Sequence, residues 1–143
     1  MEKLVNESNL DEVYHLIQKG RKLIGLDMED VKSILVGKEG ILYEAYNDEG
    51  VENGAFAKEY FDTLKKMEMV QNCTGLLFNI VMLHDDQLVM DDMEIIRDFT
   101  QFLEEKDVVI HWGMRVDERG SRTSILTICT KNASLLRRFC TSS

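Results

Sequence analysis

Proline is absent from the 143 residues, so the chain offers no proline-rich linker, and no shift in composition marks a domain boundary. No stretch approaches the ~20 uninterrupted apolar residues that a membrane-spanning helix needs. Residues 1–9 contain no long apolar run and include two glutamates, so we expect neither a signal peptide nor a transit peptide there. These absences predict one domain without membrane insertion, and a chain of this length can bury a core without disulfides or metals.

Cysteine is scarce, and its spacing favours neither disulfides nor metal binding. Cys73, Cys129 and Cys140 are odd in number, and no two of them have C-x-x-C spacing. Cys73 and Cys129 adjoin apolar strand patterns, which is typical of small buried residues. We therefore predict a protein of the reducing cytoplasm, with no metal site and no cofactor.

Basic residues are outnumbered by acidic ones. The sequence has 17 Lys and Arg against 26 Asp and Glu, a formal net charge of -9. Binding to a nucleic-acid backbone needs a surface rich in Lys and Arg, and anionic lipid surfaces attract the same residues. The charge balance therefore argues against nucleic acids and membrane surfaces as partners.

Hydrophobic periodicity divides the chain into alternating helices and strands. The last two strands are separated by a turn that suits a β-hairpin. The order α-α-β-α-β-α-β-β predicts an α/β fold, a two-layer α+β sandwich with a four-stranded mixed sheet and both long helices on one face. The expected helices are residues 10–19, 27–36, 50–70 and 89–105, and the expected strands are 40–46, 75–83, 108–116 and 123–130. The expected core includes Phe56, Tyr60, Leu64, Phe78, Ile80, Ile96, Phe99 and Ile110.

Several segments, taken in order, resemble the C-terminal domain of FtsZ, the bacterial homologue of tubulin. Residues 23–31, LIGLDMEDV, resemble the loop that opens the C-terminal half of FtsZ, which has the pattern I-N-x-D-F-x-D-V. Residues 74–80, TGLLFNI, are similar to its R-G-I-L-I-N-I strand, and residues 124–130 to its closing strand. The resemblance implies an N-terminal helix over residues 1–20 as a remnant of the long core helix. In the chain order that the resemblance implies, residues 21–131 form an FtsZ-like domain and residues 132–143 form a short tail.

The GTP-binding half of FtsZ has no counterpart in the sequence. Neither a glycine-rich G-G-G-T-G-T/S-G loop nor a G-x-x-x-x-G-K-[ST] motif is present. The resemblance therefore implies a stand-alone, non-enzymatic FtsZ- or tubulin-like interaction domain that binds no nucleotide, with a filament-capping or regulatory role in cell division. The partner it implies is a full-length FtsZ-type protein or a second copy of this chain.

The candidate partner-facing loop contains Gly25, Asp27, Glu29 and Asp30. In the family, two aspartates at the positions of Asp27 and Asp30 reach the nucleotide pocket of the neighbouring subunit and help to position the attacking water. Metal-assisted phosphoryl transfer needs a carboxylate or an amide that orients the attacking water. Gly25 stands where the family carries Asn, which argues for weak stimulation of hydrolysis. The residues alone allow another interpretation, since acids at a helix N-terminus stabilise the helix dipole.

Three arginines, Arg115, Arg119 and Arg122, bracket the expected turn and offer an alternative anion site. Arginine binds carboxylates and phosphates bidentately, and chorismate-mutase-like enzymes of similar architecture trimerise with arginines at the subunit seams. The alternative function is therefore a small-molecule-binding protein or a trimeric enzyme of that kind. No acid–base pair or nucleophile accompanies the arginines, and Asp117 and Glu118 could pair with them instead. A structural remnant that only oligomerises is a third interpretation.

Other motifs have less specific interpretations. His84, Asp85 and Asp86 are too tightly spaced for ligands on one helix face, which favours a solvated turn over half of a metal site. His111 alternates with apolar neighbours in an expected strand, which favours a face residue over a catalytic base. The apolar and basic tail over residues 133–139 is slightly similar to the FtsZ tail peptide that docks on membrane-tethering partners. We expect this tail to dock on its own domain.

Overall fold

The computed structural model describes residues 2–84 and 90–133, with the backbone alone for residues 90–92. The eight segments predicted from hydrophobic periodicity have the predicted type, and β1, β2 and η1 are additional. The helix implied over residues 1–20 is limited to residues 10–16, because residues 2–6 pair with β3 as a strand. The strands are β1 (Glu2–Asn6), β2 (Arg21–Ile24), β3 (Lys38–Tyr46), β4 (Gly75–Met82), β5 (Val109–Val116) and β6 (Ser124–Asn132). The helices are α1 (Leu10–Leu16), α2 (Met28–Leu35), α3 (Asn53–Lys66), α4 (Glu68–Asn72) and α5 (Met90–Glu104), with a short 3-10 helix η1 (Glu7–Asn9) before α1.

The sheet in the described part of the chain has six strands, not the predicted four. Its order is β1-β3-β6-β4-β5-β2, and it is mixed as predicted, because β4 and β5 are parallel and the other pairs are antiparallel. The two strands that the prediction missed, β1 and β2, lie at the edges. One side chain of β1 is buried and none of β2 is. Neither strand therefore has the alternating apolar pattern by which a half-buried strand is recognised.

The last two strands do not form the predicted hairpin. β4 lies between them, parallel to β5 and antiparallel to β6. Every residue of β4 is buried, and a strand that is apolar on both faces is stable at the centre of a sheet, where both faces are covered. The connection from β5 to β6 therefore crosses the end of β4, where the N–H of Asp117 donates to the carbonyl of Met82 at 2.8 Å.

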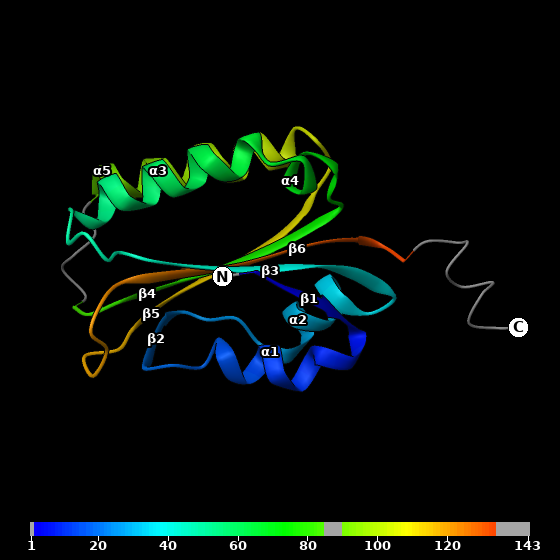
Figure 1. Ribbon diagram of the computed structural model, residues 1–143, viewed down its shortest axis with the longest axis horizontal. Helices are drawn as coiled ribbons and strands as arrows, with labels where there is room; N and C mark the ends of the chain where they lie inside the picture. Colours follow the sequence, from blue (N-terminus) through cyan, green and yellow to red (C-terminus); the bar gives the residue numbers. More distant parts are fainter. Residues whose placement is uncertain (1, 85–89, 134–143) are drawn as a thin grey trace, which may run out of the picture.

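Helices cover both faces of the sheet, so the domain has three layers and not the predicted two (Figure 1). The two long helices, α3 and α5, lie together on one face with α4, as the sequence predicted for the long pair. α1 and α2 lie on the opposite face. The prediction gave these short helices no face of the sheet, although an amphipathic helix must bury its apolar stripe against another element.

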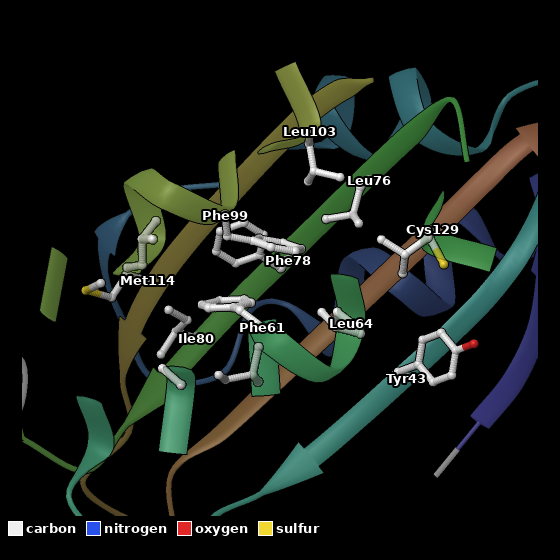
Figure 2. Packing of buried hydrophobic residues seen from close by; sticks show 14 of the residues in the cluster. Tyr43, Phe61, Leu64, Leu76, Phe78, Ile80, Phe99, Leu103, Met114 and Cys129 are labelled. Carbon is white, nitrogen blue, oxygen red and sulfur yellow. The ribbon is translucent and has the colours of Figure 1, made fainter. Parts of the chain in front are cut away.

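The larger core lies between the sheet and the helices α3 and α5 (Figure 2). The ring of Phe61 stacks on Phe99 with 4.5 Å between centroids and meets Phe78 edge-on at 5.1 Å. The prediction missed Phe61 because the buried stripe of α3 is rotated from the expected one and consists of Gly54, Ala57, Phe61 and Leu64. Among the predicted core residues, Leu64, Phe78, Ile80, Ile96 and Phe99 are buried, whereas Phe56, Tyr60 and Ile110 are partly buried at the margin.

The predicted helix over residues 50–70 is divided into two helices. Met67 has an extended backbone (φ -77°, ψ 132°), which ends α3, and α4 begins at the next residue. Val70 of α4 and Cys73 after it are buried in the larger core. The break therefore lets the chain turn back over the sheet before it enters β4.

The smaller core, between the sheet and the helices α1 and α2, positions the candidate loop. Leu26, which precedes α2, belongs to this cluster and is 6% exposed. The loop between β2 and α2 is therefore held against the sheet directly before Asp27. The cluster also contains Val13, Ile17, Val31, Ile34 and Leu35 from the helical layer, and Leu77, Leu126 and Ile128 from the sheet.

Candidate functional site

The candidate loop begins in the edge strand β2 and is held close to β5. Ile24 pairs with Met114 after a shift in register between Lys22 and Ile24. Gly113 allows this approach, because a Cβ atom there would lie 2.9 Å from the carbonyl oxygen of Ile24 and 2.9 Å from Cγ of Leu26. A larger residue at position 113 would therefore move the loop away from the sheet.

Asp27 and Asp30 form a reciprocal capping box at the start of α2. Oδ1 of Asp27 accepts a hydrogen bond from the N–H of Asp30 at 2.9 Å, and Oδ2 of Asp30 accepts one from the N–H of Asp27 at 2.9 Å. The hydrogen bond from the N–H of Asp30 lowers the pKa of the Asp27 carboxyl. Both acids therefore stabilise the helix start, and the same box holds both carboxylates at one end of α2.

Asp30 also contacts the sheet through His111 in β5. Oδ1 of Asp30 lies 3.0 Å from Nδ1 of His111, and Nε2 of His111 lies 3.3 Å from Oγ of Ser33. No sequence pattern predicted a role for His111 in the loop, because His111 and Asp30 are far apart along the chain. The alternation of β5 is a weak signal for it, since it places His111 on the same face as Gly113, where the loop passes.

The outer surface of the loop combines acids with exposed apolar side chains. Leu23 is 41% exposed and Ile24 is 38% exposed. The side chain of Glu29 is 81% exposed, with Oε1 3.5 Å from Nζ of Lys32. β2 lies at the edge of the sheet, and all of its residues are exposed. An edge strand with exposed apolar residues is typical of a protein contact surface.

Gly25 lies beneath the side chain of Lys22. A Cβ atom at position 25 would be 2.2 Å from Cδ of Lys22. An asparagine at this position, which the FtsZ pattern carries, would therefore require Lys22 to move. The aliphatic part of a lysine is flexible, so the glycine is a local difference that the rest of the loop could accommodate.

Two arginines of the alternative anion site have partners inside the domain. Nη1 of Arg115 donates to the carbonyl of Gly20 at 3.1 Å, and the residue is 8% exposed. Arg122 forms an ion pair with Asp48, and its guanidinium carbon lies 4.0 Å from the ring centroid of Tyr46. The two guanidinium groups therefore have different partners in the domain.

Arg119, the third arginine, lines a separate hollow of about 480 Å³. Lys19 and Arg21 line the same hollow, as do the carboxylates of Asp117 and Glu118. An anion held there would meet basic groups from the segment before β2, which the sequence did not associate with the turn. It would also meet the carboxylates of Asp117 and Glu118 in the turn, which would repel it.

Some predicted features lie outside the described residues. These are residues 85 and 86 of the histidine–aspartate motif and residues 134–143 of the tail. Within residues 2–84 and 90–133, no group of three or more His, Cys, Asp and Glu side chains is placed to hold a metal ion. In that part of the chain, no helix combines the length and the apolar character needed to cross a membrane.

The order of the strands and the helices on both faces of the sheet define a mixed α/β domain. A solved FtsZ dimer from M. jannaschii, in its empty form, has a TM-score of 0.59 over 85% of this chain at 18% identity. A tryptophan-to-tyrosine mutant of FtsZ from the same organism has a TM-score of 0.52 over 90% of this chain at 16% identity. The FtsZ-like fold implied by the sequence motifs is therefore confirmed.

The chain spans 36% and 38% of the length of these two FtsZ proteins. This share is consistent with a fragment that resembles the C-terminal domain. The sequence matches no protein-family model, and a comparison with the curated proteins found no match. The likeness is accordingly one of fold.

Proposed function

We propose that this protein is an FtsZ- or tubulin-like interaction domain that binds a filament subunit through the loop between β2 and α2. The observation that carries the proposal is the fixed surface of this loop. Asp27 and Asp30 are held by each other and by His111, beside the exposed side chains of Leu23 and Ile24. Side chains that are already ordered lose little conformational entropy when a partner binds.

The FtsZ-like fold supports an FtsZ-type subunit as the partner, since one of the similar proteins is an FtsZ dimer. Heterologous contacts build open filaments, in which one face of a subunit meets a different face of the next. The 143 residues contain the loop and no glycine-rich phosphate loop. A protein with one of two complementary faces adds to a filament end but cannot be extended, so it caps that end. We propose this role in cell division, in the cytoplasm.

The hydrogen bonds of the loop also bear on the partner's GTP hydrolysis. Both carboxylate oxygens of Asp30 have a partner within the domain, whereas the capping box uses one oxygen of Asp27. A role in positioning the attacking water would therefore fall mainly on Asp27. Because Gly25 replaces the asparagine of the FtsZ pattern, the loop has no side-chain amide beside the Asp27 carboxylate. We therefore expect the protein to stimulate the partner's GTP hydrolysis only weakly.

The test is to titrate the protein into polymerising FtsZ from the organism that encodes it, following light scattering and phosphate release. Leu23→Lys removes an exposed apolar contact without touching the core, and Glu105→Gln is a control that changes a charge after the end of α5. We expect substoichiometric shortening of filaments by the unchanged protein and by Glu105→Gln, but not by Leu23→Lys. Capping would be refuted if filaments kept their length at equimolar protein. It would also be refuted if the Leu23→Lys variant shortened them as much as the unchanged protein does.

A further inference from the structure

A pocket of about 320 Å³ lies between the connection from β3 to α3 and the first turns of α3. α3 covers the face of the sheet opposite α2 (Figure 1), so this pocket is separate from the candidate loop. Its volume is at the lower end of the range of about 300–1,000 Å³ for small-molecule sites. The walls include the aromatic rings of Tyr46, Phe56 and Tyr60 and the carboxylates of Asp48, Glu49 and Glu59.

One wall of the pocket already binds a cation from the protein itself. The guanidinium of Arg122 pairs with Asp48 and lies 4.0 Å from the ring centroid of Tyr46. An aromatic face and a carboxylate together form a favourable site for guanidinium and ammonium groups. Arg122 itself is not among the residues that line the pocket.

The other aromatic rings are held in place by contacts behind the pocket. Phe56 and Tyr60 stack with 6.5 Å between centroids and 21° between planes. The hydroxyl of Tyr60 donates to Oγ1 of Thr127 in β6 at 2.8 Å. This hydroxyl is therefore satisfied within the domain, and the pocket meets the apolar part of the ring. The aromatic side of the pocket is therefore preformed.

The rim of the pocket is also ordered. Nδ2 of Asn47 donates to the carbonyl of Val51 at 2.7 Å and to Oδ1 of Asn53 at 3.3 Å, which closes the connection between β3 and α3. Glu49 and Glu59 form no ion pair with any described residue, in contrast to Asp48. The pocket therefore has two carboxylates without an ion-pair partner among the described residues, beside aromatic rings, in a chain whose net charge is -9.

We propose that this pocket binds an alkyl guanidinium or alkyl ammonium group. The carboxylates would pair with the cation, and the rings of Phe56 and Tyr60 would cover its alkyl chain and its face. Arg122 shows the same kind of binding in its contacts with Asp48 and Tyr46. An arginine or lysine side chain of a partner protein and a free amine share this chemistry. The pocket does not involve the loop before α2, so this proposal stands or fails independently of filament capping.

The test is a titration followed by NMR chemical shifts of the backbone amides, with butylguanidinium as the probe. Neutral butylurea has a similar shape and serves as the uncharged control. We expect saturable shifts around Phe56 and Glu59 with the cation and none with the urea. Glu59→Gln should weaken binding about fivefold or more, as should Phe56→Leu, which keeps an apolar side chain but removes the ring face. Glu105→Gln should leave binding unchanged.

A second arm distinguishes the two sources of the cation. A blocked glycine-rich peptide with one central arginine is titrated in the same way, and tighter binding than that of butylguanidinium assigns the pocket to a partner protein's side chain. Equal affinities assign it to a free amine. Chemical shifts that fail to saturate would indicate general attraction to an acidic surface. So would an affinity for butylguanidinium that Glu105→Gln weakens as much as Glu59→Gln does. Either result would overturn the proposal.

Discussion

The carboxylate of Asp30 and the imidazole of His111 join the start of α2 to β5, with 3.0 Å between Oδ1 and Nδ1. The side chains are 27% and 28% exposed, so the contact is screened by water only in part. The same carboxylate closes the capping box with Asp27. One residue therefore couples the geometry of the candidate loop to the sheet beneath it.

A double-mutant cycle measures this coupling. For Asp30→Asn, His111→Gln and the double variant, denaturant melts near neutral pH should give a coupling energy of about 0.5–1 kcal/mol. The matched control is the exposed pair Glu29 and Lys32, at 3.5 Å, for which the coupling should be near zero. Equal couplings in the two cycles would mean that Asp30 and His111 do not hold the loop.

The capping role of Asp27 separates the stability of α2 from its binding function. Asp27→Ala removes the acceptor for the N–H of Asp30 and should lower the melting temperature, whereas Asp27→Asn keeps an oxygen in place and should lower it less. Thermal melts by circular dichroism measure both. Asp27→Asn also removes the charge, so a loss of filament capping without a loss of stability would assign the charge to partner binding. Equal melting temperatures for the two variants would contradict the cap.

The position of the buried stripe on α3 predicts an unequal effect of two phenylalanine substitutions. Phe61 is 1% exposed and contacts Phe78 and Phe99, whereas Phe56 lies partly exposed at the margin of the core. Phe61→Ala should lower the free energy of unfolding by about 3–5 kcal/mol, and Phe56→Ala by clearly less. Similar losses in urea melts would place the two rings in equivalent surroundings.

Stability should fall in alkaline solution. Burial raises the pKa of the Cys73 thiol to about 11 and that of Cys129 to about 12. A hydrogen bond with Glu44, followed by burial, raises the pKa of Tyr46 to about 12, and burial also raises the pKa of Tyr60. Above about pH 8.5, the unfolded chain begins to lose these protons while the folded protein retains them. Stability is therefore full below that pH and declines as the pH rises towards about 11–12.

Urea midpoints measured from about pH 8 to about pH 11 check this decline. Cys73→Ala removes one of the shifted groups and should make the decline shallower, measured against its own midpoint near neutral pH. The buried thiols should also react slowly with a thiol reagent in the folded protein, because the reactive thiolate is suppressed. A midpoint that is constant across this range would contradict the assignment of these groups as buried and neutral.

The chain should bind neither GTP nor GDP. The motivation is the lack of a glycine-rich loop that could present backbone N–H groups to phosphates. Calorimetric titration of the protein with either nucleotide and magnesium should give no heat of binding. A dissociation constant in the micromolar range would contradict the expectation and would indicate a phosphate site of another kind.

Much of the fold followed from local patterns in the sequence. The apolar stripes of α2 and α5 and the apolar run of β4 each specify an element, because burial against a sheet requires those spacings. The boundaries of α2 follow from Asp27 and Asp30 at its start and from Gly37 after its end, which has a φ of 71°. These features depend on residues within a few positions of one another.

The tertiary structure decided what depends on partners distant in the chain. β1 and β2 became strands because β3 and β5 offered free edges, and their own side chains give no strand signal. β4 separated the expected hairpin because its two apolar faces are stable only at the centre of the sheet. The sequence by itself determined which segments are helical, the four inner strands and the acidic loop, but not the break between α3 and α4 at Met67. Only the tertiary structure placed His111 against Asp30 and gathered the rings and carboxylates of the α3 pocket, because such contacts join elements whose relative positions no local pattern encodes.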